Sequence, residues 1–453
     1  MATRTPALVT LEEALSSPRA TRLARYEAYV NPDLAALLKL VGFDRHFVSA
    51  AGCVVVDDRG REYLDFLGGY GALGLGHNHP EVLAAVDAVA QLPNVLQVAV
   101  SPLVGAVAES LAAIAPPGLR KTFLCNSGAE AVEGALKLAR AATGRAGFVS
   151  CDGAFHGKSF GALSVGGRDH YRDPFAPLLA DCRRVPFGDV GALRAALADG
   201  TCAAFIVEPV QGEGGIVVAP DSYLAAAQQA CRDTGTLLIA DEVQTGFGRT
   251  GAMFACAHDG VAPDIMALAK TLGGGVMPVG AFMATDEVWT KGFGGSQRCT
   301  LHTSTFGGNA RACAAALKAI EILVRDDLPA QAHARGDRLI RGLREAAAGS
   351  AAVVDVRGRG LMVGVEFARS RLARGLSHEY FAAEVAAGLL DHGVISAYTL
   401  NNPSVIRFEP PLTVTDGQID TAVEAFRTTL RTHGSFARAS VRVGLGMLRK
   451  KLR

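Results

Sequence analysis

The chain has 453 residues, 49% of them hydrophobic, so it can bury a large core, and its length alone suggests two or three domains. Its 45 basic residues nearly cancel its 44 acidic residues, which argues against a nucleic-acid-binding protein that works by bulk charge. The nine cysteines are scattered without a C-x-x-C pair, which predicts reduced thiols in a cytoplasmic protein rather than a disulfide framework or a metal site.

The first 80 residues predict helices followed by a hairpin. Residues 1 to about 40 are mixed in character and favour helices, without the layout of a signal peptide. Residues 53–66 predict two strands with Asp58-Arg-Gly60 at the turn. No apolar run of about 20 residues occurs anywhere in the chain, so we expect no membrane span.

From about residue 81, helical patterns alternate with short apolar strands. This alternation predicts an α/β fold in which a mostly parallel sheet is covered by helices. The strand candidates are Lys121–Cys125, Gly147–Cys151, Ala203–Glu208, Leu237–Asp241 and Val279–Ala284.

From about residue 315 the pattern changes to that of a smaller α+β domain. A long helical stretch reaches Ala348, and strand-like segments follow at 353–358, 361–367 and 405–408. We therefore expect an N-terminal segment at 1–80 that joins the small domain, a large domain at 81–315, the remaining small domain at 316–435 and a basic tail at 436–453. The tail holds six Arg or Lys and no acid, which favours a solvated or dimer-packed end over an amphipathic helix that binds a membrane or partner.

Asp241 and Lys270 are the strongest candidates for catalysis. Asp241 ends an apolar strand, where open α/β sheets bind ligands, and alternation should direct the neighbouring Glu242 the opposite way. Lys270 follows an uncharged segment and precedes Gly273-Gly-Gly275. A lysine in apolar surroundings tends to have a lowered pKa and to be nucleophilic. Such a lysine and acid are the minimum set for pyridoxal phosphate (PLP) chemistry.

Three further segments are candidate parts of the same site. Ser127, Gly128 and Ala129 open a helix after a strand, and Ser127 and Glu130 have capping-box spacing, so this start is either an anion site or simply a capped helix. Phe155 offers a ring face and His156 follows it, although core packing is the alternative for both. The loop from Thr303 to Asn309 is rich in hydroxyls and glycine, which suits phosphate binding or an ordinary turn.

Together, these segments resemble class III aminotransferases, the ω-amino-acid group of the PLP fold-type I enzymes. The resemblance covers roughly residues 25 to 430, and its core runs from Leu238-Ile-Ala-Asp-Glu-Val-Gln-Thr-Gly-Phe-Gly-Arg-Thr-Gly251 to Lys270. Flanking segments such as Gly153-Ala-Phe-His-Gly-Lys-Ser and residues 399–411 are most similar to putrescine aminotransferases. The resemblance implies a transaminase with a large sheet domain and a smaller α+β domain.

The resemblance also implies the roles of individual residues. Lys270 would form the Schiff base with PLP and shuttle the proton, and Asp241 would pair with the ring nitrogen. Phe155 would stack on the ring and Gln244 would reach its hydroxyl. Thr305 would bind phosphate from the neighbouring subunit of a homodimer with shared sites. The remaining cofactor contacts would come from Ser127, Gly128, Ala129, His156, Glu208 and Val243.

Substrate selection would depend on Tyr70, Glu213 and Arg407. Arg407 would bind the α-carboxylate of glutamate or 2-oxoglutarate. Glu213 would neutralise Arg407 when an amine without that carboxylate enters. Tyr70 would line the channel, at a position where a Phe is more usual. That difference, with the apolar stretch at 36–51, suggests an amine larger or less charged than putrescine.

The expected reaction is therefore transamination of a terminal (ω) amine, such as a diamine, with 2-oxoglutarate as acceptor. Alternatives within the class are an ornithine- or acetylornithine-type enzyme and one that aminates an aldehyde or ketone of secondary metabolism. Epimerases and aminomutases with this fold stay open. A non-catalytic PLP-binding protein is disfavoured by the intact site, and a nicotinamide dehydrogenase by the lack of G-x-G-x-x-G after a first strand.

Overall fold

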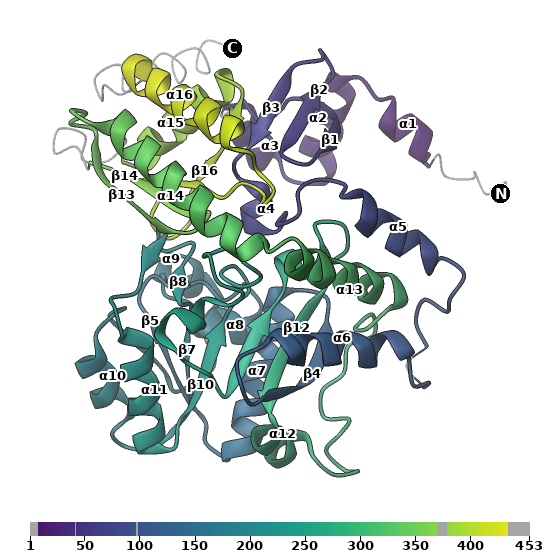
Figure 1. Cartoon of the computed structure of the whole chain (residues 1–453), viewed down its shortest axis with the longest axis vertical. Helices are drawn as coiled ribbons and strands as arrows, with labels where there is room; N and C mark the ends of the chain where they lie inside the picture. Colours follow the sequence, from purple (N-terminus) through teal and green to yellow (C-terminus); the bar gives the residue numbers. More distant parts are fainter. Residues whose placement is uncertain (1–7, 41, 97, 369–377, 434–453) are drawn as a thin grey trace, which may run out of the picture.

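A computed structural model of the chain describes residues 8–40, 42–96, 98–368 and 378–433. A large helix-covered sheet occupies the lower half of Figure 1, and smaller sheets with their helices occupy the upper half. The tail predicted at 436–453 lies outside the described residues. Within the described ranges, no helix is long and apolar enough to cross a membrane. All nine cysteines fall inside these ranges and are free.

Seven strands form the large sheet, in the spatial order β4–β12–β11–β10–β7–β5–β6. β12 is antiparallel to both of its neighbours, whereas the other pairs are parallel, so the predicted mostly parallel sheet is confirmed. Strands β5, β7 and β11 are buried along their whole length, as expected when helices cover both faces. The strands are β4 (Leu119–Cys125), β5 (Gly147–Cys151), β6 (Cys182–Val185), β7 (Cys202–Val207), β10 (Leu237–Asp241), β11 (Ile265–Leu268) and β12 (Gly280–Thr285).

Helix α7 (Gly128–Thr143) shows how the local sequence positions the site. Its apolar face packs on the sheet, and Gly134 lies so close to the Phe282 ring that a Cβ there would come within 2.1 Å of it. Ser127 caps its start and Gly144, in the left-handed region, ends it. Other helices around the large sheet are α5 (Pro80–Ala88), α6 (Pro102–Ile114), α8 (Phe160–Ser164), α9 (Asp169–Arg172), α10 (Val190–Leu197), α11 (Tyr223–Thr234), α12 (Asp286–Phe293) and α13 (Ala310–Arg325).

Two smaller four-stranded sheets join distant parts of the chain. The hairpin predicted at 53–66 is confirmed, and its second strand pairs in parallel with β15. The first sheet contains β1 (Phe47–Ala51), β2 (Val54–Asp57), β3 (Glu62–Asp65) and β15 (Val394–Ile395). The second contains β13 (Val353–Arg359), β14 (Met362–Phe367), β16 (Ala397–Tyr398) and β17 (Val405–Phe408), and a separate ribbon contains β8 (Val210–Gln211) and β9 (Val217–Val218).

The prediction of a single long helix that reaches Ala348 is wrong. Helix α13 ends at Arg325 and α14 (Leu328–Ala347) starts after Asp327, whose φ of 44° lies in the left-handed region. Pro329 lies in the first turn of α14, where a proline is tolerated, whereas inside a continuous helix it would remove a hydrogen bond. The remaining helices are α1 (Leu11–Leu15), α2 (Arg19–Tyr29), α3 (Pro32–Leu40), α4 (Gly68–Gly71), α15 (His378–Asp391) and α16 (Asp416–His433).

The five strand candidates of the large sheet are confirmed with small shifts at their ends, but two of its strands were not predicted. Strand β6 has the sequence Cys-Arg-Arg-Val and contains no apolar run. Strand β11 has only four residues, and in the sequence it cannot be told apart from the rest of the uncharged segment before Lys270. The domain limits at 80, 315 and 435 stay predictions.

Candidate active site

A cavity of about 510 Å³ opens at the carboxyl ends of the central strands. Its volume falls within the usual range for small-molecule sites. Ala72, Leu73 and residues 275–279 also line it. The predicted residues that line this one cavity are Ser127, Gly128, Ala129, Phe155, His156, Glu208, Asp241, Val243, Gln244 and Lys270.

One wall of the cavity is the start of α7. The Glu130 amide donates to Ser127 Oγ at 3.2 Å. The return bond of the predicted capping box is absent here, because the Glu130 carboxylate accepts from the amide and side chain of Asn126 instead, at 2.8 and 2.9 Å. The α7 N-terminus faces the cavity with its helix dipole, which favours an anion.

Close packing against Val243 leaves no room for a side chain at Gly128, in addition to the predicted close approach of a phosphate. A Cβ at Gly128 would lie 2.7 Å from Val243 Cγ1, and a β-branched side chain cannot easily turn away. Gly128→Ala is therefore expected to lower the free energy of unfolding by about 1–3 kcal/mol. Gly105→Ala is the matched control, since a Cβ there meets nothing within 4 Å. Equal unfolding midpoints for the two variants in denaturant titrations would contradict this account.

The floor of the cavity is an Asp–His pair. Asp241 Oδ2 lies 2.7 Å from His156 Nδ1, and Asp241 Oδ1 accepts from the Val243 amide at 3.0 Å. Burial acts to lower the pKa of His156, but the hydrogen bond and charge of Asp241 outweigh it and raise that pKa. His156 Nε2 is buried and has no hydrogen-bond partner among the described residues. Glu242 is directed elsewhere and accepts from the Cys256 amide at 2.7 Å.

Glu208 lies beside this pair at the end of β7. Its carboxylate accepts from the amides of Phe155 at 2.8 Å and Gly212 at 3.0 Å. Burial nevertheless raises its pKa to about 7. The two amide bonds fix the turn that carries Phe155 into the cavity wall.

Lys270 faces this floor from the end of β11. Burial lowers its pKa, against the opposing pull of the carboxylates of Glu409 and Glu213. Its φ of 50° lies in the left-handed region, which is uncommon for a residue with a side chain and often marks a functional position. The strand that leads to Lys270, β11, is completely buried, whereas charged groups act on the Lys270 side chain itself.

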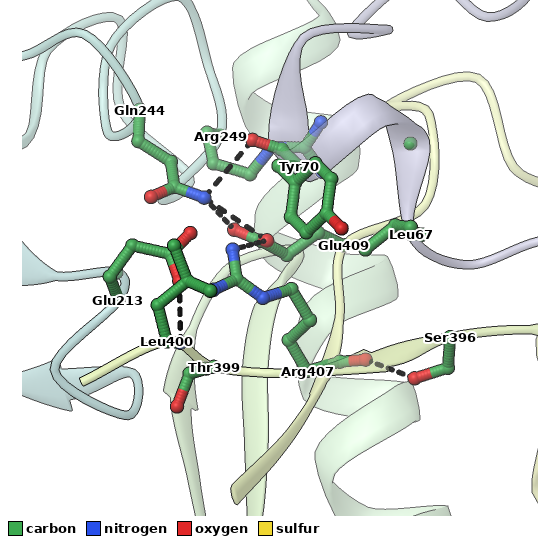
Figure 2. A network of polar contacts seen from close by, with 12 residues as sticks. Leu67, Tyr70, Glu213, Gln244, Arg249, Ser396, Thr399, Leu400, Arg407 and Glu409 are labelled. Carbon is green, nitrogen blue, oxygen red and sulfur yellow. Dashed lines mark hydrogen bonds and ion pairs between the residues drawn. The ribbon is translucent and has the colours of Figure 1, made fainter. Parts of the chain in front are cut away.

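The predicted substrate residues Tyr70, Glu213 and Arg407 lie close together, as Figure 2 shows. Arg407 on β17 is completely buried, and its Nη2 lies 2.6 Å from Glu213 Oε2. Glu213 Oε2 also accepts from the Leu400 amide at 2.8 Å. The Tyr70 ring covers the guanidinium of Arg407, with 5.3 Å between Cζ and the ring centroid. These three residues therefore contact one another as a group, although none of them is among the cavity-lining residues.

Thr305 lies apart from this cavity. It is exposed on the loop between α12 and α13, and it is not among the lining residues. This placement leaves untested the prediction that Thr305 reaches the site of a neighbouring subunit.

Two buried residues of the site were missed in the sequence. Glu409 is completely buried, and its Oε2 accepts from Arg407 Nη1 at 3.0 Å. The spacing of two residues along a strand was a usable signal, because it puts Glu409 on the same side as Arg407. Arg249 is also completely buried and donates to the carbonyls of Leu361 and Pro410. Its place within the 238–251 segment gave no indication of this burial.

Gln244 contacts protein groups in this structure. Its Nε2 donates to both carboxylate oxygens of Glu409, at 2.9 and 3.1 Å, and to the Tyr70 carbonyl at 3.1 Å. Gln244 therefore ties the cavity wall to Tyr70 and Glu409, while its predicted contact with a ring hydroxyl stays a prediction.

The chain matches the family model described as "Aminotransferase class-III" over residues 42–430. Several solved structures are similar. An ornithine aminotransferase from Toxoplasma gondii ME49 is 32% identical, with a TM-score of 0.84 over 95% of this chain and 99% of that one. An amine transaminase from an uncultivated Pseudomonas species is 31% identical, with a TM-score of 0.80 over 86% and 95%. An (S)-enantioselective ω-transaminase from Thermomicrobium roseum is 30% identical, with a TM-score of 0.84 over 92% and 98%.

Proposed function

The chain belongs to the class III aminotransferases, and from that premise we propose that it moves the amino group of a terminal amine to 2-oxoglutarate. The enzyme uses PLP, which is named in a solved structure of the similar Toxoplasma gondii ornithine aminotransferase. When bound, PLP supplies an electron sink that stabilises a substrate carbon after loss of its proton.

The residues of the cavity fit this cofactor. The start of α7 suits the phosphate group, and the Asp241 carboxylate suits a protonated ring nitrogen. The buried His156 Nε2, without a partner among the described residues, leaves a polar atom for a bound group to satisfy. Phe155 offers a ring face on the cavity wall. We assign the cofactor site to these residues.

In the proposed mechanism, Lys270 is the general base and acid. Its Nζ takes the proton from the amine-bearing carbon of the substrate and returns a proton in the following step. The lowered pKa of Lys270 helps, because a neutral amine is needed to accept that proton. Asp241 holds the ring nitrogen protonated by its charge, and its bond to His156 keeps the carboxylate oriented.

The observation that carries the choice of substrate is the ion pair of Arg407 with Glu213. In this closed arrangement the arginine is neutralised, so the site can accept an amine that has no carboxylate. For 2-oxoglutarate to bind, Glu213 must leave and the acid must take its place on Arg407. Glu213 lies between Gly212 and Gly214 on the turn that joins β8 and β9, where a change of backbone path is easiest.

Glu213→Gln should impair the half-reaction with the amine without impairing the half-reaction with 2-oxoglutarate. We expect kcat/KM for the amine to fall about ten- to a hundredfold, because Arg407 loses one of its two carboxylate partners and is less fully neutralised when an amine without a carboxylate enters. KM for 2-oxoglutarate should be unchanged or lower. Glu81→Gln is the matched control, since it breaks an ion pair with Arg325 on α13, outside the cavity. An equal loss in both half-reactions would contradict the switch.

The amine can be identified by a direct screen. Purified enzyme with PLP is given glutamate and a series of aldehydes, or 2-oxoglutarate and a series of diamines and ω-amino acids. We expect exchange with putrescine or a longer terminal amine. No exchange with any terminal amine would contradict the proposal.

A second candidate is an ornithine-type aminotransferase. The likeness to the Toxoplasma gondii enzyme, 32% identical over 95% of this chain, favours it. Ornithine and acetylornithine therefore belong in the same screen. The two candidates differ in whether the far end of the amine substrate carries a carboxylate, so a preference for ornithine over putrescine would decide for the second.

A homodimer with shared sites is part of the proposal. Thr305 is exposed and apart from the cavity of its own subunit. Val100, which lines a second cavity with Gly307 and Gly308 of the same loop, is 100% exposed, which is unusual for an apolar side chain of a monomer and fits a surface that a second copy covers. A cytoplasmic location stays a prediction.

A further inference from the structure

Glu409 lies where it can control how strongly Arg407 attracts a substrate carboxylate. It follows Arg407 by two residues at the end of β17, and both side chains are completely buried. Its Oε2 accepts from Arg407 Nη1 at 3.0 Å, on the opposite terminal nitrogen from the one that faces Glu213. Arg407 thus has two carboxylate partners, and only one of them has to leave when an acid binds.

Glu409 is the fixed partner of the two. Both of its oxygens accept from Gln244 Nε2, and its own amide donates to the Phe66 carbonyl at 2.7 Å. Moving this carboxylate would break its bonds to Gln244 and Arg407 together, in a place where water cannot replace them. Among the described residues, the Glu213 carboxylate contacts one other side chain, Arg407, and one amide, that of Leu400, while its backbone carbonyl accepts from the Asn401 amide at 2.8 Å.

The other charges that face Glu409 do not cancel this effect. Arg249 is buried nearby and its charge interacts with that of Glu409, but its guanidinium donates to the carbonyls of Leu361 and Pro410, and no ion pair with Glu409 occurs among the described residues. Lys270 lies on the cavity side and experiences the charge of Glu409, which acts to raise its pKa. Among the described residues, Arg407 is therefore the cation that forms an ion pair with Glu409.

We infer that Glu409 is a specificity-determining positioning residue, which keeps Arg407 partly neutralised in both half-reactions and so weakens the binding of carboxylates relative to amines without one. This inference rests on the proposed function. It assigns the substrate class more narrowly, to amines whose far end is neutral or cationic. An Arg407 with Glu213 as its sole partner would become a free cation whenever Glu213 leaves, and would bind an acid much more tightly.

The test is the affinity for glutarate, a dicarboxylate that resembles 2-oxoglutarate but cannot react. Its dissociation constant is measured by calorimetry on the PLP-loaded enzyme. We expect glutarate to bind about tenfold more tightly to Glu409→Gln than to the wild-type protein. Glu409→Asp keeps the charge but withdraws it from Arg407, so it should bind glutarate about two- to threefold more tightly. Glu242→Gln is the control, because it removes another completely buried carboxylate that contacts Cys256 rather than Arg407.

In steady-state assays, Glu409→Gln should also lower KM for 2-oxoglutarate and raise KM for a diamine, which general damage to the fold would not do. Unchanged or weaker glutarate binding in Glu409→Gln would overturn the inference. If that variant does not fold, unchanged glutarate binding in Glu409→Asp would overturn it equally. Failure of the proposed function can be distinguished from failure of this inference. The affinity for glutarate can be measured even if the wild-type protein transfers no amino group.

Discussion

Lys270→Ala should reduce turnover by about ten-thousand-fold or more, the largest effect expected for any single substitution in this chain. Lys270 is the one lysine among the cavity-lining residues, and the lowered pKa makes its neutral form available. The variant loses the nucleophile and the proton carrier together. The measurement is single-turnover amino transfer at saturating amine, with PLP content checked by absorbance.

The control for this variant is Lys318→Ala. Lys318 pairs with Glu321 at 2.6 Å on α13, away from the cavity, so its removal should leave turnover unchanged. A small primary amine added to Lys270→Ala should restore part of the rate, because it supplies the missing base. Turnover of Lys270→Ala within tenfold of the wild-type rate would refute the assignment of Lys270.

Asp241→Asn should lower kcat by about a hundred- to ten-thousand-fold while the protein stays folded. Asparagine keeps the shape of the side chain and an oxygen for the Val243 amide, but loses the charge that holds a ring nitrogen protonated. The same substitution should lower the pKa of His156, since the hydrogen bond and charge of Asp241 are what raise it. The measurements are kcat and the His156 titration followed by NMR.

Glu242→Gln is the control for Asp241→Asn. It removes the neighbouring buried acid, which accepts from the Cys256 amide and does not line the cavity. We expect it to cost stability, because a buried hydrogen-bonded carboxylate is replaced, with little change in kcat. A larger loss of kcat in Glu242→Gln than in Asp241→Asn would show that the wrong acid has been assigned.

Much of the large domain could be predicted from local patterns, because its buried strands are short apolar runs between helical segments. The same patterns placed Asp241 at a strand end and Lys270 in apolar surroundings, and the structure brings both into one cavity. Strand β6 was not predicted because it contains two arginines and no apolar run. The other strands of the sheet supply most of the buried apolar side chains, so β6 does not need them. The break between α13 and α14 was missed although Pro329 was visible in the sequence.

Contacts between distant segments set the limit of prediction for the site. The packing of Gly128 against Val243 depends on how α7 meets the loop after β10, which no local pattern specifies. The capping-box spacing correctly predicted Ser127 as the cap, but the Glu130 carboxylate accepts from Asn126 rather than from Ser127, which depends on the local path of the chain. Glu409 could have been found from its spacing to Arg407, whereas its bonds to Gln244 could not.

The most direct test of the central claim is transfer of labelled nitrogen from putrescine to 2-oxoglutarate by the purified PLP-loaded enzyme. The proposed function predicts labelled glutamate by mass spectrometry with the wild-type protein, and none with Lys270→Ala. Absence of label in glutamate with wild-type enzyme, for putrescine and for every other terminal amine supplied in its place, would contradict it.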